Sequence, residues 1–481
     1  MTLTDKINSL EKLVTTLLSR VTQLESENDH LRGENTVLRQ EVLSLRTQLD
    51  KNSKNSHKPP SSDGYSKKPA LSKPSGKVLG GQLGHQGKTL EMVAIPDNVV
   101  EHHAKVCRSC QGVLTSKDII KLGSKHQVFD LPEQKLFVTE HQLNISQCSC
   151  GCQSKALLPT ELASCPVQYG SSIKALSVHL NTDFKIPFHK INTLFFDLYG
   201  YQFNESTALS ANKSAFERLE NIENQTGGEP LKEQLINAPV LHADETGIRC
   251  AGSLHWLHVN SNPLYTYLFV HQKRGKIAIE SQQSILPQFS NYLMHDCWAS
   301  YWNLSQSKHL ICNAHLIREL QALIDKGSQW ADTMKTFLLD LYNKTKKINL
   351  TLDVKLVGKV LQEFHQICQE GIQQEPQPIK IANKRGRIAK SKGLNLLERL
   401  RNNQDAVLSF AFHQEVPFTN NQAERDLRMV KTKMKVSTCF RTIVGANHYA
   451  RIQGFISTMR KQNMNPFQNL KLVFQNQFQW T

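Results

Sequence analysis

Hydrophobic residues recur every seven positions through the first fifty residues. Leucines occupy one register position, and β-branched residues, asparagines or a leucine follow four positions later. This spacing is typical of a coiled coil, in which buried asparagines at the a position favour a parallel dimer at some cost in stability. The sequence therefore predicts a leucine zipper over residues 1–50 that forms a homodimer, and a helix packed on its own globular domain is the alternative. The expected interface residues are Leu10, Leu17, Leu24, Leu31, Leu38, Asn28 and Asn35.

The heptad pattern stops at Lys51, and residues 51–90 are rich in Ser, Lys, Pro, Gly and Asn. Residues 51–88 contain eight lysines and the single acid Asp63, a net charge of +7. This composition predicts a flexible basic linker. Such a linker either follows a DNA backbone without reading its sequence or serves only as a solubilising tether.

Two cysteine clusters follow within residues 91–166. Strand-like segments at residues 127–131, 136–139 and 143–145 separate the clusters. Paired thiolates on either side of a hairpin are what a structural zinc ribbon requires. We therefore expect a zinc-binding module in which four of five thiols bind Zn²⁺, and free buried thiols are the alternative. The five are Cys107, Cys110, Cys148, Cys150 and Cys152.

Residues 167–237 have helical spacing, with apolar side chains at intervals of three and four and with Asn204 and Ser206 as polar caps. Three short helices joined by tight turns fit a helix-turn-helix DNA-binding region, whose last helix, from about Ser206, would enter a major groove. A plain helical connector has the same pattern. Both interpretations stay open on the sequence alone.

From Ala238 the pattern changes to short strands, expected at residues 239–243, 255–259, 265–271, 292–296 and 309–312, with a helix at 275–286. Asp244 would end the first strand and Asp296 the fourth, and these strands would be neighbours in one sheet. Two carboxylates brought that close repel each other unless a cation lies between them. With Glu424, which opens a later helical segment, they suit a site for two divalent cations. The alternative is that the three acids have no shared site, because acids at strand ends and helix starts commonly have such spacing.

Residues 316–415 are mostly helical in pattern and include a basic loop at 384–392 without an acid. After Pro417, Asn420 and Asn421 can cap the helix that carries Glu424. Positively charged side chains follow Glu424 in this helix. They suit an anionic substrate that contacts these side chains and also reaches the acid. The residues expected to contact DNA phosphates are Lys384, Arg385, Arg387, Lys390 and Lys392 in the loop, for which a solvated surface is the alternative, and Arg425, Arg428, Lys431, Lys433 and Lys435 in the helix.

Composition narrows the class of partner. The chain has 481 residues, a formal charge of +16 and an isoelectric point near 9.3. Lys and Arg release condensed counterions when they neutralise phosphates, so a polyanion such as double-stranded DNA is the expected partner. No run approaches 18 consecutive apolar residues, and the N-terminal residues lack the apolar stretch of a signal peptide. We therefore expect a cytoplasmic protein without a membrane partner, whose eleven cysteines are thiols or metal ligands.

Four motifs carry a family resemblance: residues 242–246 (HADET), 295–301 (HDCWASY), 312–320 (CNAHLIREL) and 416–425 (VPFTNNQAER). Together they resemble the catalytic motifs of the insertion sequence 66 family of bacterial transposases. The likeness extends to the zipper, the segments 58–63 and 80–85, the cysteine clusters and the helical region near Tyr169, and so covers nearly the whole chain. The cluster at residues 148–152 departs from the regular second knuckle of that family.

The resemblance implies a multidomain DDE transposase with an α/β ribonuclease H-like catalytic domain at residues 238–445. A mostly helical insertion at about 316–415 would interrupt this domain, and a C-terminal helical element at 446–481 would follow it. Asp244, Asp296 and Glu424 would bind two Mg²⁺ ions, or Mn²⁺ in their place. Such an enzyme binds the terminal inverted repeats of its element, cleaves a strand at each end and joins the 3′ hydroxyl ends to target DNA. Helper proteins of the same element and a nucleoid-associated location in a bacterium fit the same resemblance.

Two other function classes stay open. A DNA-binding regulator accounts for the zipper, the cysteine clusters and the charge, but not for the three acids. A ribonuclease H-like nuclease that cuts particular DNA structures accounts for the acids. It explains a zipper and a zinc module joined by a basic linker less directly.

Overall fold

The computed structural model describes residues 3–49, 90–159, 162, 165–225, 230–348, 354–376 and 390–480. These residues divide into two units. One contains the described residues between Ser66 and Leu162 together with Asn192–Phe203, and the other contains the rest. Nearly all of the expected linker lies outside the described residues, as do Lys384, Arg385 and Arg387 of the expected basic loop.

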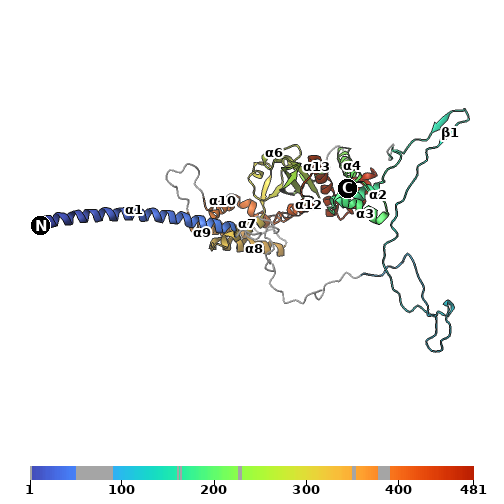
Figure 1. Ribbon diagram of the computed structural model, residues 1–481, viewed down its shortest axis with the longest axis horizontal. Coiled ribbons are helices and arrows are strands. Elements are labelled where there is room, and N and C mark those ends of the chain that lie inside the picture. The colour runs from blue at the N-terminus through green and yellow to red at the C-terminus, as the bar shows by residue number, and fades with distance from the viewer. Residues whose placement is uncertain are drawn as a thin grey trace. The chain divides into compact units, whose positions relative to one another are not determined.

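The heptad region forms one helix, α1 (Leu3–Leu49), as the repeat predicts (Figure 1). Four zipper leucines whose side chains are described are each more than half exposed: Leu17, Leu24, Leu31 and Leu38. A stripe of exposed leucines along a long helix is what the predicted coiled-coil interface requires. The helix is therefore confirmed, and its pairing stays a prediction.

The unit that contains the cysteine clusters has little regular structure. Its strands, β1 (Ile145–Gln147) and β2 (Gln153–Lys155), form an antiparallel hairpin around residues 148–152. The strands expected at 127–131 and 136–139 are wrong, because those residues form none. Phe137 is 92% exposed there, so no apolar contact holds that stretch in a sheet. The turn η2 (Ser116–Asp118) follows the first cluster.

The expected helical region contains α2 (Ser171–Thr182), α3 (Phe188–Tyr199) and α4 (Glu205–Gln225), and α5 (Pro230–Ile236) follows. Helices α2 and α4 share one apolar core with the C-terminal helices α13 (Ile443–Lys461) and α14 (Pro466–Phe474). Ala175, Ala215, Ile452, Phe455 and Leu470 lie in this core. Helices α2 and α4 are therefore built into the same body as the C-terminal helices.

Five strands form a mixed sheet in the order β5-β4-β3-β6-β7. They are β3 (Val240–Cys250), β4 (Ser253–Ser261), β5 (Thr266–His271), β6 (Tyr292–His295) and β7 (Lys308–Ile311). Strands β3, β4 and β5 are antiparallel neighbours, whereas β6 and β7 run parallel to β3. All five predicted strands are present, and the neighbouring positions of the first and fourth strands are confirmed.

Two expected boundaries are wrong. Strand β3 continues to Cys250 through its pairing with β4, so Asp244 lies within the strand and not at its end. The expected helix at 275–286 is only α6 (Lys276–Ile279), followed by the turn η3 (Leu286–Gln288). The Ser281 hydroxyl donates to the Ala278 carbonyl at 2.8 Å, a local bond that competes with continuation of the helix.

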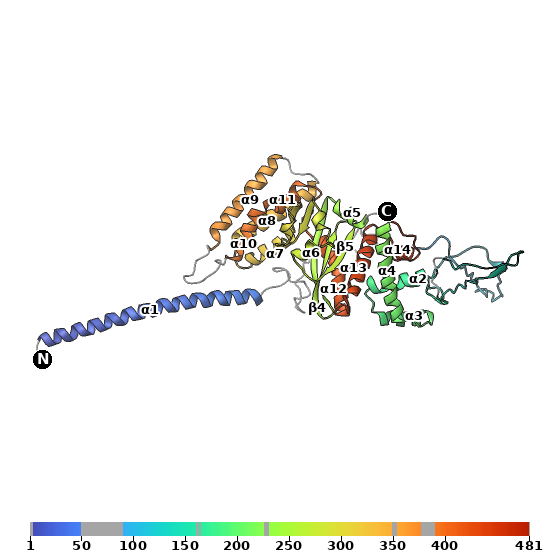
Figure 2. The same cartoon turned by 90° about the horizontal axis from the view of Figure 1, so that it is seen from above.

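The stretch expected to be helical contains α7 (Asn313–Ile324), α8 (Gln329–Ile348), α9 (Val354–Gln374), α10 (Lys392–Asn402) and α11 (Gln404–Phe412), and α12 (Asn421–Ser437) follows it. Helices α8 to α11 gather beside β7, whereas α12 and α13 pack on β3, β4 and β5 (Figure 2). The first group shares a core with Val240 and Met294, and the second group packs against Ile248 and Cys250. Val240, Ile248 and Cys250 of β3 all have even numbers, so both cores lie on one face of the strand.

Candidate active site

Asp244 and Asp296 lie side by side on the sheet. In the parallel pairing of β3 and β6, Val240 is opposite Tyr292 and His242 is opposite Met294. Two residues further along the same register, Asp244 is level with Asp296, which directly follows β6. Asp244 has the same parity as Val240 and Ile248, so its side chain lies on the face that carries the two helical cores.

The Asp244 carboxyl is in an unfavourable place for a negative charge. Burial is the largest effect that raises its pKa well above the ordinary value for aspartate, and the charge of Glu245 comes next. The charges of Asp296 and Glu424 raise the pKa of Asp244 further, so both other predicted acids act on this carboxyl. The Asp244 and Asp296 carboxylates each accept a local backbone N–H, from Glu245 at 2.8 Å and from Trp298 at 2.9 Å.

Asn420 fixes the start of α12 against the sheet. Its Nδ2 donates to the Ala243 carbonyl at 2.8 Å, and its Oδ1 lies 2.8 Å from His242 Nδ1. Its backbone N–H donates to Cys312 Sγ at 3.1 Å. Asn420 is therefore the N-cap residue of α12, but its side chain bonds to β3 instead of to its own helix. These bonds hold the first turn of α12, and with it Glu424, over β3 near Ala243 and over the end of β7.

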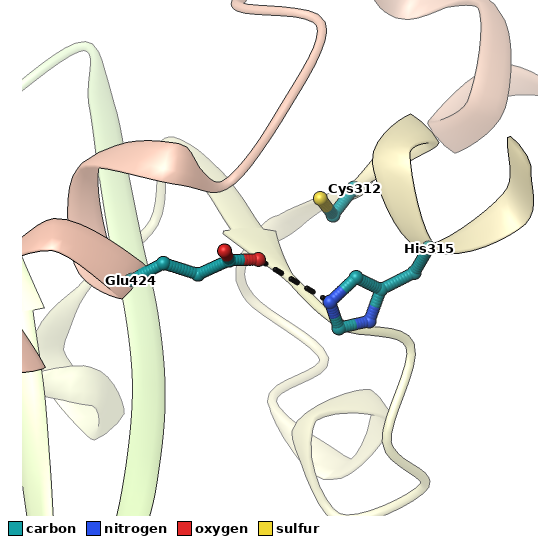
Figure 3. A group of neighbouring side chains, drawn as sticks. All are labelled: Cys312, His315 and Glu424. Carbon is teal, nitrogen blue, oxygen red and sulfur yellow. Dashed lines mark ion pairs between the residues drawn. The ribbon is translucent and has the colours of Figure 1, made fainter. Parts of the chain in front are cut away.

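Glu424 faces α7 (Figure 3). Its Oε1 lies 3.3 Å from His315 Nε2 and 3.9 Å from an Arg318 guanidinium nitrogen. The contact with His315 is the largest effect that lowers the pKa of Glu424. Oε1 is nevertheless a buried oxygen that accepts no hydrogen bond of good geometry within the described part of the chain. It can therefore take a further positive ligand.

Glu245, which the sequence did not single out, is fully engaged on the opposite face of β3. Tyr301 Oη donates to its Oε2 at 2.5 Å, and Arg274 Nε donates to its Oε1 at 2.7 Å. The Arg274 guanidinium stacks on Trp298, 4.1 Å from the ring centroid, and lies 5.0 Å from that of Trp256. A buried acid with a stacked arginine and a tyrosine is a structural anchor for the loop after Asp296. The only sequence signal was its place directly after Asp244.

The predicted cations of α12 divide by exposure. Lys433 is buried, and burial lowers its pKa, so it does not lie on the solvent face of the helix. Lys390, in the loop before α10, pairs with Glu398. Lys392, the first residue of α10, is exposed. Four α12 cations are exposed and follow Glu424 along the helix: Arg425, Arg428, Lys431 and Lys435.

Each cysteine cluster forms a tight turn. In the first, the Cys107 N–H donates to the Gly112 carbonyl at 2.8 Å, and the Cys110 N–H is the largest effect that lowers the pKa of the Cys107 thiol. In the second cluster, the Cys150 N–H is the largest effect that lowers the pKa of the Cys148 thiol. Thiolates that accept backbone N–H bonds suit a metal, but the structure does not gather thiols from both turns into one cluster. Among the described residues, the group of three or more metal-binding side chains is Cys312, His315 and Glu424.

The sequence implies Mg²⁺ at the three acids and Zn²⁺ at the clustered cysteines, and the two donor sets can be compared with these metals in turn. Carboxylate oxygens are the ligands that Mg²⁺ prefers, and a cation beside Asp244 would offset the burial and the repulsion that raise its pKa. The donor set and its electrostatics therefore fit Mg²⁺. The cysteine turns fit Zn²⁺ by ligand type and local hydrogen bonding.

Comparison with known families shows which family the chain belongs to. The sequence matches the Transposase IS66 family over residues 166–448, more than half of the chain. The chain belongs to the IS66 family of transposases. The match begins just before α2 and ends within α13, so it includes the sheet, the insertion helices and all three acids. The predicted family is thereby confirmed.

Membership makes this transposase a DNA-modifying enzyme with an α/β catalytic domain. Residues 7–91 match a second family, whose function is unknown. No curated protein matches the chain. Among the described helices, none combines the length and apolar character that a membrane span needs.

Proposed function

We propose that this IS66-family transposase is a DDE enzyme with a ribonuclease H-like catalytic domain, in which Asp244, Asp296 and Glu424 hold two Mg²⁺ ions, or Mn²⁺ in their place. The observation that carries the proposal is geometric: the register of β3 and β6 brings Asp244 level with Asp296, and Asn420 bonds the start of α12, which carries Glu424, to β3. The direction in which the pKa of Asp244 is shifted agrees with this arrangement. The strand order, with three antiparallel strands followed by two parallel ones, supports the ribonuclease H-like assignment. When bound, the cations would supply positive charge at the attacking and leaving oxygens of a phosphoryl transfer.

The proposed reaction has two steps at one site. Water hydrolyses one phosphodiester bond at each end of the element and leaves a 3′ hydroxyl. That hydroxyl then attacks a phosphorus of the target strand and displaces a 3′ oxygen, which takes up a proton. Both steps are in-line displacements, so the same three carboxylates serve both, without a covalent protein intermediate.

The exposed cations of α12 support DNA as the substrate that lies across the acids. Arg425 follows Glu424 directly, and Arg428 and Lys435 lie further along the exposed side of the helix. Arg and Lys neutralise backbone phosphates without reading the base sequence. In the proposal they lead each element end toward the carboxylates, while His315 and Arg318 keep positive charge beside Glu424.

The remaining parts belong to the same proposal. The exposed leucines of α1 pair with a second copy, and four of the five clustered cysteines bind structural Zn²⁺. Helices α2 to α4 contact DNA through surfaces that do not pack on α13 and α14. Helper proteins of the same element and a nucleoid-associated location complete it.

The test is a strand-transfer assay with labelled element ends, with and without Mg²⁺. We expect Asp244→Asn to bind ends with the affinity of the wild type but to lose both cleavage and joining. Asp340→Asn, an exposed acid on α8, is the matched control and should behave as the wild type. Cleavage by Asp244→Asn at the wild-type rate would refute the catalytic role of Asp244. DNA binding by the wild type without any Mg²⁺-dependent cleavage would favour a regulator. Cleavage without joining in the wild type would favour a nuclease.

A further inference from the structure

Glu424 also belongs to a second group of possible metal ligands, which includes a thiol and an imidazole. Cys312, His315 and Glu424 each offer one ligand atom, and the three atoms lie within 4.8 Å of one another (Figure 3). Sulfur, imidazole nitrogen and carboxylate oxygen are the donors that Zn²⁺ takes in proteins, whereas Mg²⁺ takes oxygen. The group therefore suits a softer cation than the one proposed for the three acids.

Local structure brings these donors together. Cys312 is the N-cap residue of α7, and His315 lies three residues later in the first turn of that helix. Residues three apart in a helix lie on one side of it. Glu424 comes from the first turn of α12, which Asn420 fixes to the sheet. Two helix starts thus face each other across the group.

The spacing is close to that of a bound ion. In a tetrahedral site with bonds of about 2.1 Å, nitrogen and oxygen ligands lie roughly 3.4 Å apart. His315 Nε2 and Glu424 Oε1 lie 3.3 Å apart, so this pair already has the required separation. Cys312 Sγ lies within 4.8 Å of a ligand nitrogen of His315 and a carboxylate oxygen of Glu424, so closure around an ion needs a shift of at most about 1.2 Å.

Two further features of this group suit a bound cation. Cys312 is fully buried, and its sulfur accepts the Asn420 N–H at 3.1 Å. Backbone N–H donors commonly support metal-bound thiolates from outside the ligand shell. Glu424 Oε1 accepts no hydrogen bond of good geometry within the described part of the chain. Both observations are independent of the ligand spacing.

We propose that Cys312, His315 and Glu424 form a binding site for one Zn²⁺ ion, with a fourth position open to water, and that zinc at this site competes with Mg²⁺ for Glu424. Binding releases the thiol proton of Cys312 to solvent. Because a single carboxylate would serve both sites, zinc withdraws the third acid from Asp244 and Asp296. The competition rests on the proposed function, whereas the zinc site itself does not.

The first experiment counts zinc. The full chain is equilibrated with a buffered free Zn²⁺ concentration, and bound zinc per chain is measured for the wild type, Cys312→Ser and His315→Asn. Cys368→Ser is the matched control, because that thiol is buried on α9 away from the group. We expect both site variants to bind one zinc fewer than the wild type and the control, since the five clustered cysteines are unchanged in all of them. Equal zinc content in all four proteins would overturn the site.

The second experiment measures inhibition. Mg²⁺-dependent cleavage of labelled ends is followed as Zn²⁺ is added, and each protein is normalised to its own rate without zinc. The zinc concentration for half inhibition should rise at least about tenfold in Cys312→Ser relative to Cys368→Ser, since one of three ligands is lost. Equal inhibition of both would overturn the competition. If no protein cleaves DNA with Mg²⁺, the proposed function fails, and the zinc counts still decide whether the site exists.

Discussion

Asp244 and Glu245 are consecutive residues on β3, and their side chains lie on opposite faces of the strand. Glu245 is compensated by Arg274 and by a tyrosine hydroxyl. Burial and three neighbouring acids raise the pKa of Asp244, and the backbone N–H of Glu245 opposes them. A nearby cation would favour the ionised form of an acid placed in this way. Because successive side chains of a strand point to opposite faces, Glu245 lies among groups that compensate its charge, whereas Asp244 lies on the face of the predicted site.

Lys185 offers a pH-dependent prediction away from the acids. Its ammonium is buried, donates to Gln453 Oε1 at 2.6 Å and to the Thr182 carbonyl, and lies 5.4 Å from the Tyr449 ring centroid. Burial lowers its pKa from 10.5 to about 8, although Asp183 opposes the change. A base with a lowered native pKa destabilises the fold below that pKa, and stability rises with pH up to the unfolded pKa.

We therefore compare the free energy of unfolding of the wild type with that of Lys185→Met. The wild-type value should rise by about 3 kcal/mol more than the variant's value between pH 8 and pH 10.5. Denaturant unfolding of both proteins across this range measures the difference. Taking the difference removes the contributions of other groups that titrate there. A constant gap between the two proteins would show that Lys185 is charged in the folded state throughout.

At the scale of elements, one arginine joins α4 to α13. Arg451 is buried on α13 and contacts Glu223 Oε1 at 2.5 Å and Glu220 Oε1 at 2.8 Å. Glu223 is equally buried, whereas the Glu220 side chain is 47% exposed. Removing one partner from a buried ion pair leaves the other charge without compensation, at a cost of about 3–5 kcal/mol. We expect this loss for Arg451→Met, and less than about 1 kcal/mol for Glu220→Gln, in denaturant unfolding. Similar losses for the two variants would contradict the role of burial.

The exposed side of α12 gives a second element-scale prediction. If Arg428 neutralises one DNA phosphate, Arg428→Ala should lower the slope of log affinity against log salt by about 0.9 for duplex DNA. Lys433→Met is a matched control on the same helix, because Lys433 is buried and should leave the slope unchanged. Titrations of labelled element ends at several salt concentrations measure both slopes. An unchanged slope for Arg428→Ala would remove this residue from the DNA contact.

Sequence spacing predicted the strands and helices of the catalytic region better than their ends. Apolar runs located all five strands, but β3 runs beyond Asp244 because its later residues pair with β4, a contact that no local pattern records. The expected helix after Gly275 stops at Ile279, since polar residues there bond to their own backbone. The pairing of Glu245 with Arg274 could not be predicted either, since it joins residues from separate strands and loops through side-chain packing.

At the scale of the whole molecule, the three acids lie between two separately packed cores. The insertion helices share a core with Val240 and Met294, while α12 and α13 pack against Ile248 and Cys250. Asp244 lies between these positions on the same face of β3. The long insertion between Asp296 and Glu424 therefore does not carry the third acid away, because its core is anchored on the strands that hold the first two.

The N-terminal helix makes the largest-scale prediction, which concerns the number of copies that act together. A pair of asparagines at a positions costs stability but restricts a coiled coil to two strands. We expect the full-length wild type to be a dimer by light scattering, and replacement of both Asn28 and Asn35 by Val to raise its melting temperature and add higher oligomers. Ser26→Val, on the outward side of the predicted heptad, is the matched control and should change neither. A monomeric wild type would contradict the pairing. A dimer that the double replacement leaves unaltered would place the interface outside the zipper, because only residues buried in the seam can set its register.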